Sequence, residues 1–243
     1  MKYILVIPAR YSSSRLPGKP LLELKGKSML QRVYEKCNSV VKKELIYVAT
    51  DDSRIKDHCD SFNMQCLITS KECLTGTDRV AEVSKLIKAD YYINVQGDEP
   101  IFNPNDIKLL IESITENNKK FDVYGGYCKI HTPKKFFSQS IPKVVFNNRN
   151  ELLYMSRAGI PSNKIKSFTF GYRQVCAYAF SAYALEIFSS KSNKTIFESE
   201  EDIEILRFLE LGIKVKMLEM SDDSISIDIP EDINEVLNSL KND

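Results

Sequence analysis

The sequence is poor in the residues from which metal centres and polyanion-binding surfaces are usually built. It has two histidines, and its six cysteines include no Cys-x-x-Cys pair, so the pattern does not favour a zinc site. The formal net charge is only +1, which argues against a general nucleic-acid binder because such proteins carry a large positive excess. Any basic binding site must therefore be local.

Long apolar runs and targeting signals are also missing. No apolar segment approaches the length of a membrane span, and the short run after Lys2 leads directly into Pro8 and Arg10, which is not typical of a signal peptide. The cysteines are therefore expected to be reduced and mostly buried. We expect a cytoplasmic protein whose 43% hydrophobic residues form a substantial core.

The first half of the chain alternates between two kinds of apolar pattern. Strand-like runs cover 3–9, 44–49, 64–69 and 90–95, and helical spacing covers 29–40, 53–62, 78–87 and 105–116. Such alternation predicts an α/β fold with a mostly parallel, Rossmann-like nucleotide-binding sheet that has helices on both faces. Ligands of these sheets bind beyond the carboxyl ends of the strands.

The second half has a different rhythm. Longer strand-like runs cover 121–130, 142–147 and 174–181, joined by irregular loops with lysine and proline, and indicate an inserted β region. A helix over 200–211, strands over 214–218 and 224–228 and a helix from Pro230 follow. We expect one domain over 1–243, with a nucleotide-binding half at about 1–120, the insertion at about 121–190 and a return to the main sheet at about 191–243.

The first predicted strand leads into the loop IPARYSSSRLPGKPL, residues 7–21. Small residues leave its backbone N–H groups accessible, and Arg10, Arg15 and Lys19 can converge on one anion, which is what phosphate binding requires. The loop is neither a GxxxxGK[ST] P-loop nor the GxGxxG fingerprint of NAD(P)-binding enzymes. A merely solvated charged loop is the alternative interpretation.

Two aspartates follow predicted strands elsewhere. Asp98 lies in NVQGDEP (94–100) and Asp228 in SIDIPED (226–232), so both are expected at the same sheet edge as the first loop. Mg²⁺ typically takes one or two protein carboxylates together with substrate phosphates. A turn residue at Asp98 and a helix N-cap at Asp228 are the simpler alternatives. Together with the basic loop, the two aspartates predict a magnesium-nucleotide site.

The motifs together resemble one enzyme family over nearly the whole chain. The opening loop, LTGTDRVAEV (74–83), NVQGDEPIFNP (94–104), PKVVFNNRNELLYMSRAGIP (142–161) and IDIPEDINEV (227–236) are similar to the CMP-Kdo synthetases, the 3-deoxy-manno-octulosonate (Kdo) cytidylyltransferases. The resemblance implies that CTP and Kdo, or a close variant, give a CMP-sugar and pyrophosphate for lipopolysaccharide or capsule synthesis. It also implies dependence on Mg²⁺ and a homodimer formed through the inserted β region.

The resemblance further implies roles for individual residues. Nucleotide contacts are expected from Pro8, Ala9, Arg10, Ser13, Arg15, Lys19, Thr75, Thr77, Arg79 and Gln96. Catalytic roles fall to Arg15, Lys19, Asp98 and Asp228, of which the two aspartates hold the metal and can orient the attacking hydroxyl. Sugar contacts are expected from Gln96, Arg157, Gln174, Tyr178, Glu201 and Glu204. Arg157 would pair with the sugar carboxylate, although a surface ion pair is the alternative.

The chain departs from the family pattern on the acceptor side. Gln174 replaces the usual histidine, Cys176 the usual glycine, and Ile205 the usual glutamine of a later helix. These changes alter hydrogen-bonding capacity, so we expect the reaction class to be intact and the acceptor to be changed, to 8-amino-Kdo or another ulosonic acid. A nucleotide-binding regulatory protein is the non-enzymatic alternative, and the presence of both aspartates with the basic loop argues against it.

Overall fold

The computed structural model describes residues 1–12, 16–116, 120–225, 227 and 230–240. Three residues of the predicted site, Ser13, Arg15 and Asp228, therefore lie outside the described residues. None of the helices within the described part of the chain is long and apolar enough to cross a membrane.

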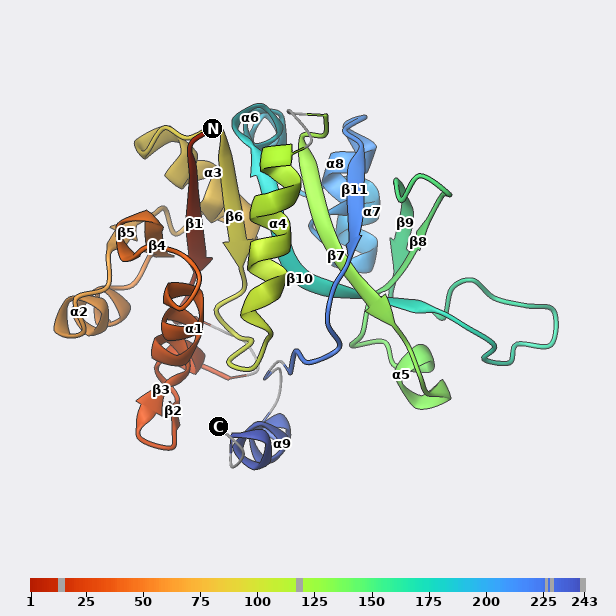
Figure 1. Ribbon diagram of the computed structural model, residues 1–243, viewed down its shortest axis with the longest axis horizontal. Helices are drawn as coiled ribbons and strands as arrows, with labels where there is room; N and C mark the ends of the chain where they lie inside the picture. Colours follow the sequence, from red (N-terminus) through yellow and green to blue (C-terminus); the bar gives the residue numbers. More distant parts are fainter. Residues whose placement is uncertain (13–15, 117–119, 226, 228–229, 241–243) are drawn as a thin grey trace.

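Eleven strands and nine α-helices are described along the chain (Figure 1). The strands are β1 (Tyr3–Pro8), β2 (Glu23–Leu24), β3 (Lys27–Ser28), β4 (Ile46–Thr50), β5 (Cys66–Ile68), β6 (Tyr91–Val95), β7 (Val123–Lys129), β8 (Lys143–Phe146), β9 (Leu152–Ser156), β10 (Tyr172–Ser181) and β11 (Val215–Glu219). The α-helices are α1 (Met29–Asn38), α2 (Ser53–Ser61), α3 (Gly76–Leu86), α4 (Pro104–Glu116), α5 (Pro133–Phe137), α6 (Ala182–Ser189), α7 (Ile196–Glu201), α8 (Leu206–Glu210) and α9 (Asp232–Ser239). Two 3₁₀ turns, η1 (Lys19–Leu21) and η2 (Lys43–Leu45), complete the set.

The central sheet has the strand order β11-β7-β10-β6-β1-β4-β5. Strands β6, β1, β4 and β5 run parallel, as do β11 and β7, whereas β10 runs antiparallel to both of its neighbours. The mainly parallel α/β sheet predicted from the sequence is thus confirmed.

Helices cover both faces of this sheet because successive strand residues point to opposite sides. In β1, Leu5 and Ile7 pack into one apolar cluster with residues of α1, α2 and α4. Ile4 and Val6 pack into a second cluster with residues of α3, α6 and α8. Figure 1 shows α4 in front of the sheet and α3, α6 and α8 behind it.

The segment expected as an inserted β region is largely built into the main sheet. β7 pairs with β10 and β11, β10 pairs with β6, and only the β8–β9 hairpin extends beyond this path, attached to β10. The sequence reasoning did not predict β9 or α6. Nor is 200–211 one helix: Asp202, with φ 50° and ψ 49°, ends α7, and α8 begins at Leu206.

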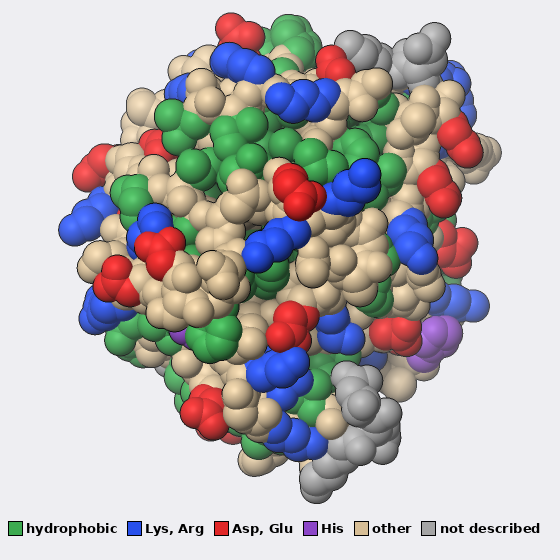
Figure 2. All heavy atoms as spheres, turned by 60° about the vertical axis from the view of Figure 1, so that its left-hand side comes forward, with side chains coloured by type: hydrophobic (Ala, Val, Ile, Leu, Met, Phe, Trp, Pro, Cys, Tyr) green, Lys and Arg blue, Asp and Glu red, His purple; other side chains and the backbone are tan. Residues whose placement is uncertain are grey.

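The β5 side of the molecule, at the left in Figure 1, is an edge of the sheet. Figure 2 turns this side forward and shows apolar side chains gathered in its upper half, with charged side chains around them. Two exposed apolar side chains are Ile68 of β5 and Leu86 of α3. With only three residues, β5 offers a short edge, which limits pairing with other strands.

The order of the parallel strands fixes where a ligand can bind. From β1 the chain moves outward to β4 and β5, then returns through α3 to β6 on the other side of β1. Connections therefore leave the carboxyl ends of β1 and β6 in opposite directions. Such a switch point opens a crevice in which α/β proteins bind their ligands.

Candidate active site

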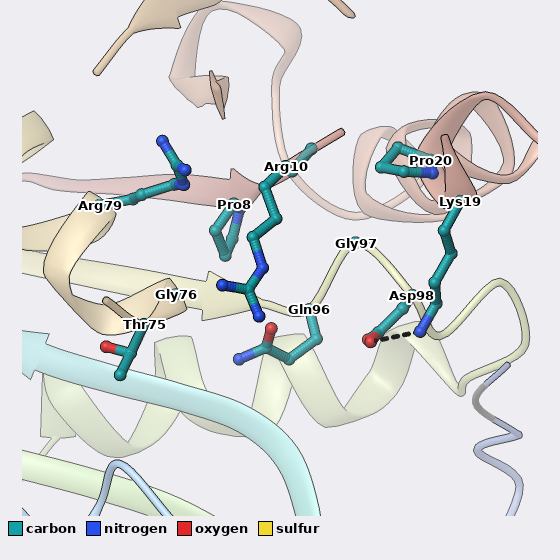
Figure 3. A pocket seen from close by; sticks show the side chains of 11 residues that line it. Pro8, Arg10, Lys19, Pro20, Thr75, Gly76, Arg79, Gln96, Gly97 and Asp98 are labelled. Carbon is teal, nitrogen blue, oxygen red and sulfur yellow. Dashed lines mark hydrogen bonds and ion pairs between the residues drawn. The ribbon is translucent and has the colours of Figure 1, made fainter. Parts of the chain in front are cut away.

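A cavity of about 170 Å³ lies at this switch point (Figure 3). It is lined from the end of β1 by Pro8, Ala9 and Arg10, from η1 by Lys19 and Pro20, from the start of α3 by Thr75, Gly76 and Arg79, and from the turn after β6 by Gln96, Gly97 and Asp98. The cavity thus brings together residues of three of the motifs identified in the sequence.

Lys19 and Asp98, which both line this cavity, form an ion pair. Lys19 Nζ lies 2.9 Å from Asp98 Oδ2, although 79 residues separate the two in sequence. The Lys19 side chain is 9% exposed and that of Asp98 is 38% exposed. The carboxylate is therefore accessible from solvent while the ammonium group that faces it is held in place.

Glycine residues allow both partners to reach this position. Gly18, just before η1, has φ +73°, a left-handed conformation that favours glycine. At Gly97 a Cβ atom would lie 2.8 Å from the carbonyl oxygen of Pro8, closer than side-chain carbons come to backbone oxygens. A glycine at 97 therefore lets the β6 turn lie directly against the end of β1.

The start of α3 provides a second cation at the cavity. Thr75 is the N-cap, and its side chain and that of Asp78 form a capping box. One turn later, the nearly buried Arg79 donates from Nη1 to Thr69 Oγ1 at 2.6 Å, and its Nη2 lies 3.0 Å from Asp51 Oδ1. Figure 3 shows that its guanidinium points away from Gln96 and Asp98. Arg79 is thus fixed at the rim that faces β4.

Glu204 links α3 to the turn after β6. Its Oε2 accepts from the backbone N–H of Thr77 at 3.0 Å, and its Oε1 accepts from Gln96 Nε2 at 3.2 Å. Burial raises the pKa of the Glu204 carboxyl group above its usual value. The side chain of Thr77 itself is fully buried and is not among the residues that line the cavity.

Gln174 and Cys176, the residues of β10 that depart from the family pattern, are not among the residues that line the cavity. Gln174 Nε2 donates to the hydroxyl of Tyr178, and the pairing of β10 with β7 shifts register between Val175 and Tyr178. Burial, followed by the negative charges of Glu99 and Asp98, raises the pKa of the Cys176 thiol.

Arg157 lies on the loop that follows β9, and backbone carbonyls hold its guanidinium. Nε donates to the carbonyl of Glu201 at 2.6 Å, Nη1 to that of Gln139 at 3.0 Å and Nη2 to that of Asp202 at 3.0 Å. Lys194 contributes most to lowering the pKa of Asp202, and the charges of Arg157 and Arg10 add to this effect. Arg157 Nη2 lies 3.9 Å from Asp202 Oδ2, so this carboxylate is paired with Arg157 as well as with Lys194.

One further predicted residue, Glu201, and one residue that was not predicted, Lys143, support this loop. The Glu201 carboxylate accepts from Ser156 Oγ at 2.6 Å and from the backbone N–H of Arg157 at 2.7 Å. Lys143, which the sequence reasoning missed, is fully buried, and its Nζ donates to the carbonyls of Ser138, Ile141 and Arg157. Burial lowers the pKa of Lys143 to about 8. The only signal in the sequence that Lys143 would hold these loops together is its place inside an apolar, strand-like run.

Ile205 and Arg207 belong to the interior. Ile205 is fully buried in the apolar cluster that also contains Tyr178, so it offers no polar group to a ligand. Arg207 is also fully buried and pairs with both carboxylate oxygens of Glu198 at 2.6 and 2.7 Å and with Asp78 at 3.0 Å. Its contacts tie α7 and α8 to the start of α3.

Ser13, Arg15 and Asp228 lie outside the described residues, but residues near them in the sequence form hydrogen bonds close to the cavity. The backbone N–H of Ile227, which precedes Asp228 in the sequence, donates to the carbonyl of Asp98 at 3.1 Å. The backbone N–H of Gly18 donates to the carbonyl of Tyr11 at 2.9 Å, which joins the two described ends of the basic loop. The cavity therefore offers cations for an anionic ligand and a carboxylate that can hold a divalent ion or orient a hydroxyl group.

Comparison with known proteins identifies relatives over the full length of the chain. The sequence profile of the family described as Cytidylyltransferase matches residues 4–217. The 3-deoxy-manno-octulosonate cytidylyltransferase of Protochlamydia amoebophila is 40% identical over 95% of this chain and 91% of its own length. The 8-amino-3,8-dideoxy-manno-octulosonate cytidylyltransferase of Shewanella frigidimarina is 37% identical over 96% of each chain.

A solved structure of CMP:2-keto-3-deoxy-manno-octonic acid synthetase complexed with CTP has the same fold. It superimposes with a TM-score of 0.92 at 34% identity and covers 100% of this chain and 99% of its own. The profile match, the relatives and the shared fold agree with the family to which the motifs pointed. This chain belongs to the cytidylyltransferase family.

Proposed function

We propose that this chain joins CTP to a 3-deoxy-2-ulosonic acid, either Kdo or a close variant, and thereby supplies lipopolysaccharide or capsule synthesis. The anomeric hydroxyl of the acid attacks the α-phosphorus of CTP. The bond from that phosphorus to the bridging oxygen of the β-phosphate breaks, pyrophosphate leaves, and the hydroxyl proton passes to a base or to solvent. The observation that carries the proposal is the Lys19–Asp98 pair, inside one cavity at the ends of β1 and β6.

The described side chains supply charge and orientation for this step. Lys19 and Arg10 neutralise the triphosphate from the β1 side, while Arg79 and Thr75 bound the opposite rim. Asp98, beside Lys19, accepts a hydrogen bond from the attacking hydroxyl. Fixed cations around a transferring phosphoryl group and an aligned nucleophile account for most of the catalysis in such reactions.

The residues present fit a magnesium ion. No cluster of three or more potential ligands occurs among the described residues, but Mg²⁺ usually keeps several waters and needs only one or two carboxylates beside substrate phosphates. The carboxylate of Asp98 is partly exposed. The backbone N–H of Ile227, the residue that precedes Asp228 in the sequence, donates to the carbonyl of Asp98. Asp98 and Asp228 would hold the ion, which when bound supplies neutralisation of phosphate charge.

A specific observation favours 8-amino-Kdo as a second candidate acceptor. Cys176 stands where relatives usually have glycine, and it lies close enough to Glu99 and Asp98 for their charges to raise its pKa. The carboxyl group of Glu204 lies at Gln96 on the other side. An acceptor that carries an ammonium group gains more attraction from such surroundings than the uncharged hydroxyl of Kdo, which can only donate a hydrogen bond.

The β8–β9 hairpin supports the proposal of a homodimer. Leu153 of β9 and Ile196 and Phe197 of α7 are 60%, 79% and 51% exposed, and the rings of Tyr154 and Phe197 are 6.0 Å apart. The hairpin and α7 thus expose apolar side chains close together, which is characteristic of an interface. A monomeric Leu153→Glu variant, beside a dimeric wild type in sedimentation velocity, would support this assignment, and a monomeric wild type would refute it.

The function is tested by pyrophosphate release from CTP and Mg²⁺ with Kdo, 8-amino-Kdo or N-acetylneuraminate. We expect release only with an acceptor present, and with one of the two octulosonates preferred. Tight binding of CTP without release for any acceptor would instead support a regulatory nucleotide-binding protein. A clear preference for unmodified Kdo would leave the reaction class intact and rule out the altered acceptor.

A further inference from the structure

Arg54, in the first turn of α2, stacks on an aromatic ring of the nucleotide-binding loop. Its guanidinium carbon lies 3.3 Å from the centroid of the Tyr11 ring, and Tyr11 follows β1 by three residues. Arg54 does not line the cavity, and its side chain is 56% exposed. It therefore contacts the loop from outside the site.

The guanidinium is fixed in orientation by the residue that caps its own helix. Asp52 is the N-cap of α2, and its Oδ1 accepts from the backbone N–H of Arg54 at 3.0 Å. Oδ1 also accepts from Arg54 Nε at 2.9 Å, and Oδ2 accepts from Nη2 at 2.7 Å. A two-point pair of this kind holds the plane of the guanidinium as well as its charge, which favours stacking on the ring.

Tyr11 in turn is in contact with Gly18, the residue just before Lys19. The carbonyl of Tyr11 accepts from the N–H of Gly18, and a Cβ on Gly18 would lie 3.1 Å from the hydroxyl oxygen of Tyr11. The ring is thus packed against the backbone of Gly18. The carbonyl of Gly18 accepts from Leu21 in the η1 turn that carries Lys19. Contacts run without a break from α2 to the Lys19–Asp98 pair.

We propose that Arg54 is a positioning residue, which clamps Tyr11 and thereby holds Gly18 and Lys19 where the triphosphate of CTP binds. The inference rests on the proposed function of the same site. It adds that part of the affinity for CTP comes from α2, a helix that does not touch the nucleotide. Without the clamp, CTP has to order the base of the loop when it binds, and affinity falls.

The test compares Arg54→Met with Lys56→Met, a matched control. Lys56 is on the same helix and also forms an ion pair, with Asp60 one turn further along α2. We expect Arg54→Met to raise both the KM for CTP and the Kd for CTP, measured without acceptor, about threefold to fivefold. The KM for the acceptor should not change, and Lys56→Met should match the wild type in all three. A loss of stability alone would not separate the two KM values in this way.

Conservative variants identify which property of Arg54 matters. Arg54→Lys keeps the charge but loses the planar fork, so we expect it to resemble Arg54→Met; full recovery would show that charge alone acts. Tyr11→Phe keeps the ring and should retain wild-type affinity, whereas Tyr11→Leu should weaken CTP binding. In the Tyr11→Leu background Arg54→Met should add no further loss, because the partner is gone.

The inference is overturned if Arg54→Met binds CTP as tightly as the wild type, or if its effect is fully additive with Tyr11→Leu. These outcomes are separate from failure of the proposed function. If the wild type bound CTP but released no pyrophosphate with any acceptor, the affinity comparison alone would still decide whether the clamp exists.

Discussion

The proposed nucleotide site and the proposed acceptor site are built in different ways. In the proposed nucleotide site, Pro8 ends β1, Lys19 begins η1 and Asp98 lies in the turn after β6, and all three line one cavity. On the acceptor side, Arg157 and Gln174 come from a hairpin and a bulged antiparallel strand, and other protein groups already occupy their polar atoms. The ends of the parallel strands β1 and β6 bring the first set together, whereas the antiparallel strand β10 and the β8–β9 hairpin position the second.

This difference teaches where each kind of specificity resides. Binding of a triphosphate needs cations at a parallel-strand switch point, which the order of β6, β1 and β4 provides. If Gln174, Tyr178 and Glu204 bind the acceptor as proposed, its recognition depends on which of their present hydrogen bonds they exchange for contacts with it. We therefore expect the removal of one charged side chain to abolish triphosphate binding. Substitutions in the proposed acceptor site should instead change the preference among acceptors step by step.

The largest effect is expected at Asp98, on the nucleotide side. Asp98→Asn removes the charge that faces Lys19 and the proposed oxygen ligand, so we expect kcat for pyrophosphate release to fall on the order of 10²- to 10³-fold. The exposed Asp223→Asn, which changes a carboxylate outside the cavity, is the matched control and should retain full activity. Equal kcat in Asp98→Asn and wild type would remove Asp98 from the reaction.

Arg157 is expected to have the next largest effect, restricted to the acceptor. Arg157→Lys replaces a fork that reaches three carbonyls by a single ammonium group, and we expect the KM for the acceptor to rise roughly tenfold or more. The KM for CTP should not change. The 77% exposed Arg149 provides the control, Arg149→Lys. An equal rise in both KM values would mean that the two sides of the crevice are not independent.

Gln174 is expected to change preference rather than activity. A histidine at this position, as in the family pattern, becomes cationic more readily than glutamine and repels the ammonium group of 8-amino-Kdo. We expect Gln174→His to raise the ratio of kcat/KM for Kdo to that for 8-amino-Kdo by about fivefold, roughly 1 kcal/mol. Parallel assays with both acceptors at saturating CTP measure this ratio directly. An unchanged ratio would exclude position 174 from the choice of acceptor.

The same contrast explains what the sequence could predict. The strands around β1 and β6 were predicted because apolar runs and loop motifs are local signals. The position of the basic loop and of Asp98 after such strands then placed Lys19 and Asp98 in one predicted site, to which the resemblance added individual roles. The hairpin strand β9 and the break at Asp202 were missed, since alternation there is weak and a left-handed aspartate has no strong local signature. Lys143 and the Arg54–Tyr11 stack depend on contacts between distant segments, which periodicity does not encode.

The smallest expected effect concerns Glu204, where the two sides meet. Burial raises the pKa of this carboxyl group in the folded state above its unfolded value near 4.5. The protonated carboxyl group therefore contributes to the free energy of unfolding fully below pH 4.5, and this contribution is lost as the pH rises through the folded pKa. Glu204→Gln, which cannot titrate, should show a smaller decline in the free energy of unfolding over this range. Denaturant unfolding at a series of pH values measures the difference between the two slopes. Identical slopes would mean that Glu204 keeps an ordinary pKa and that solvent reaches the junction between Gln96 and Thr77.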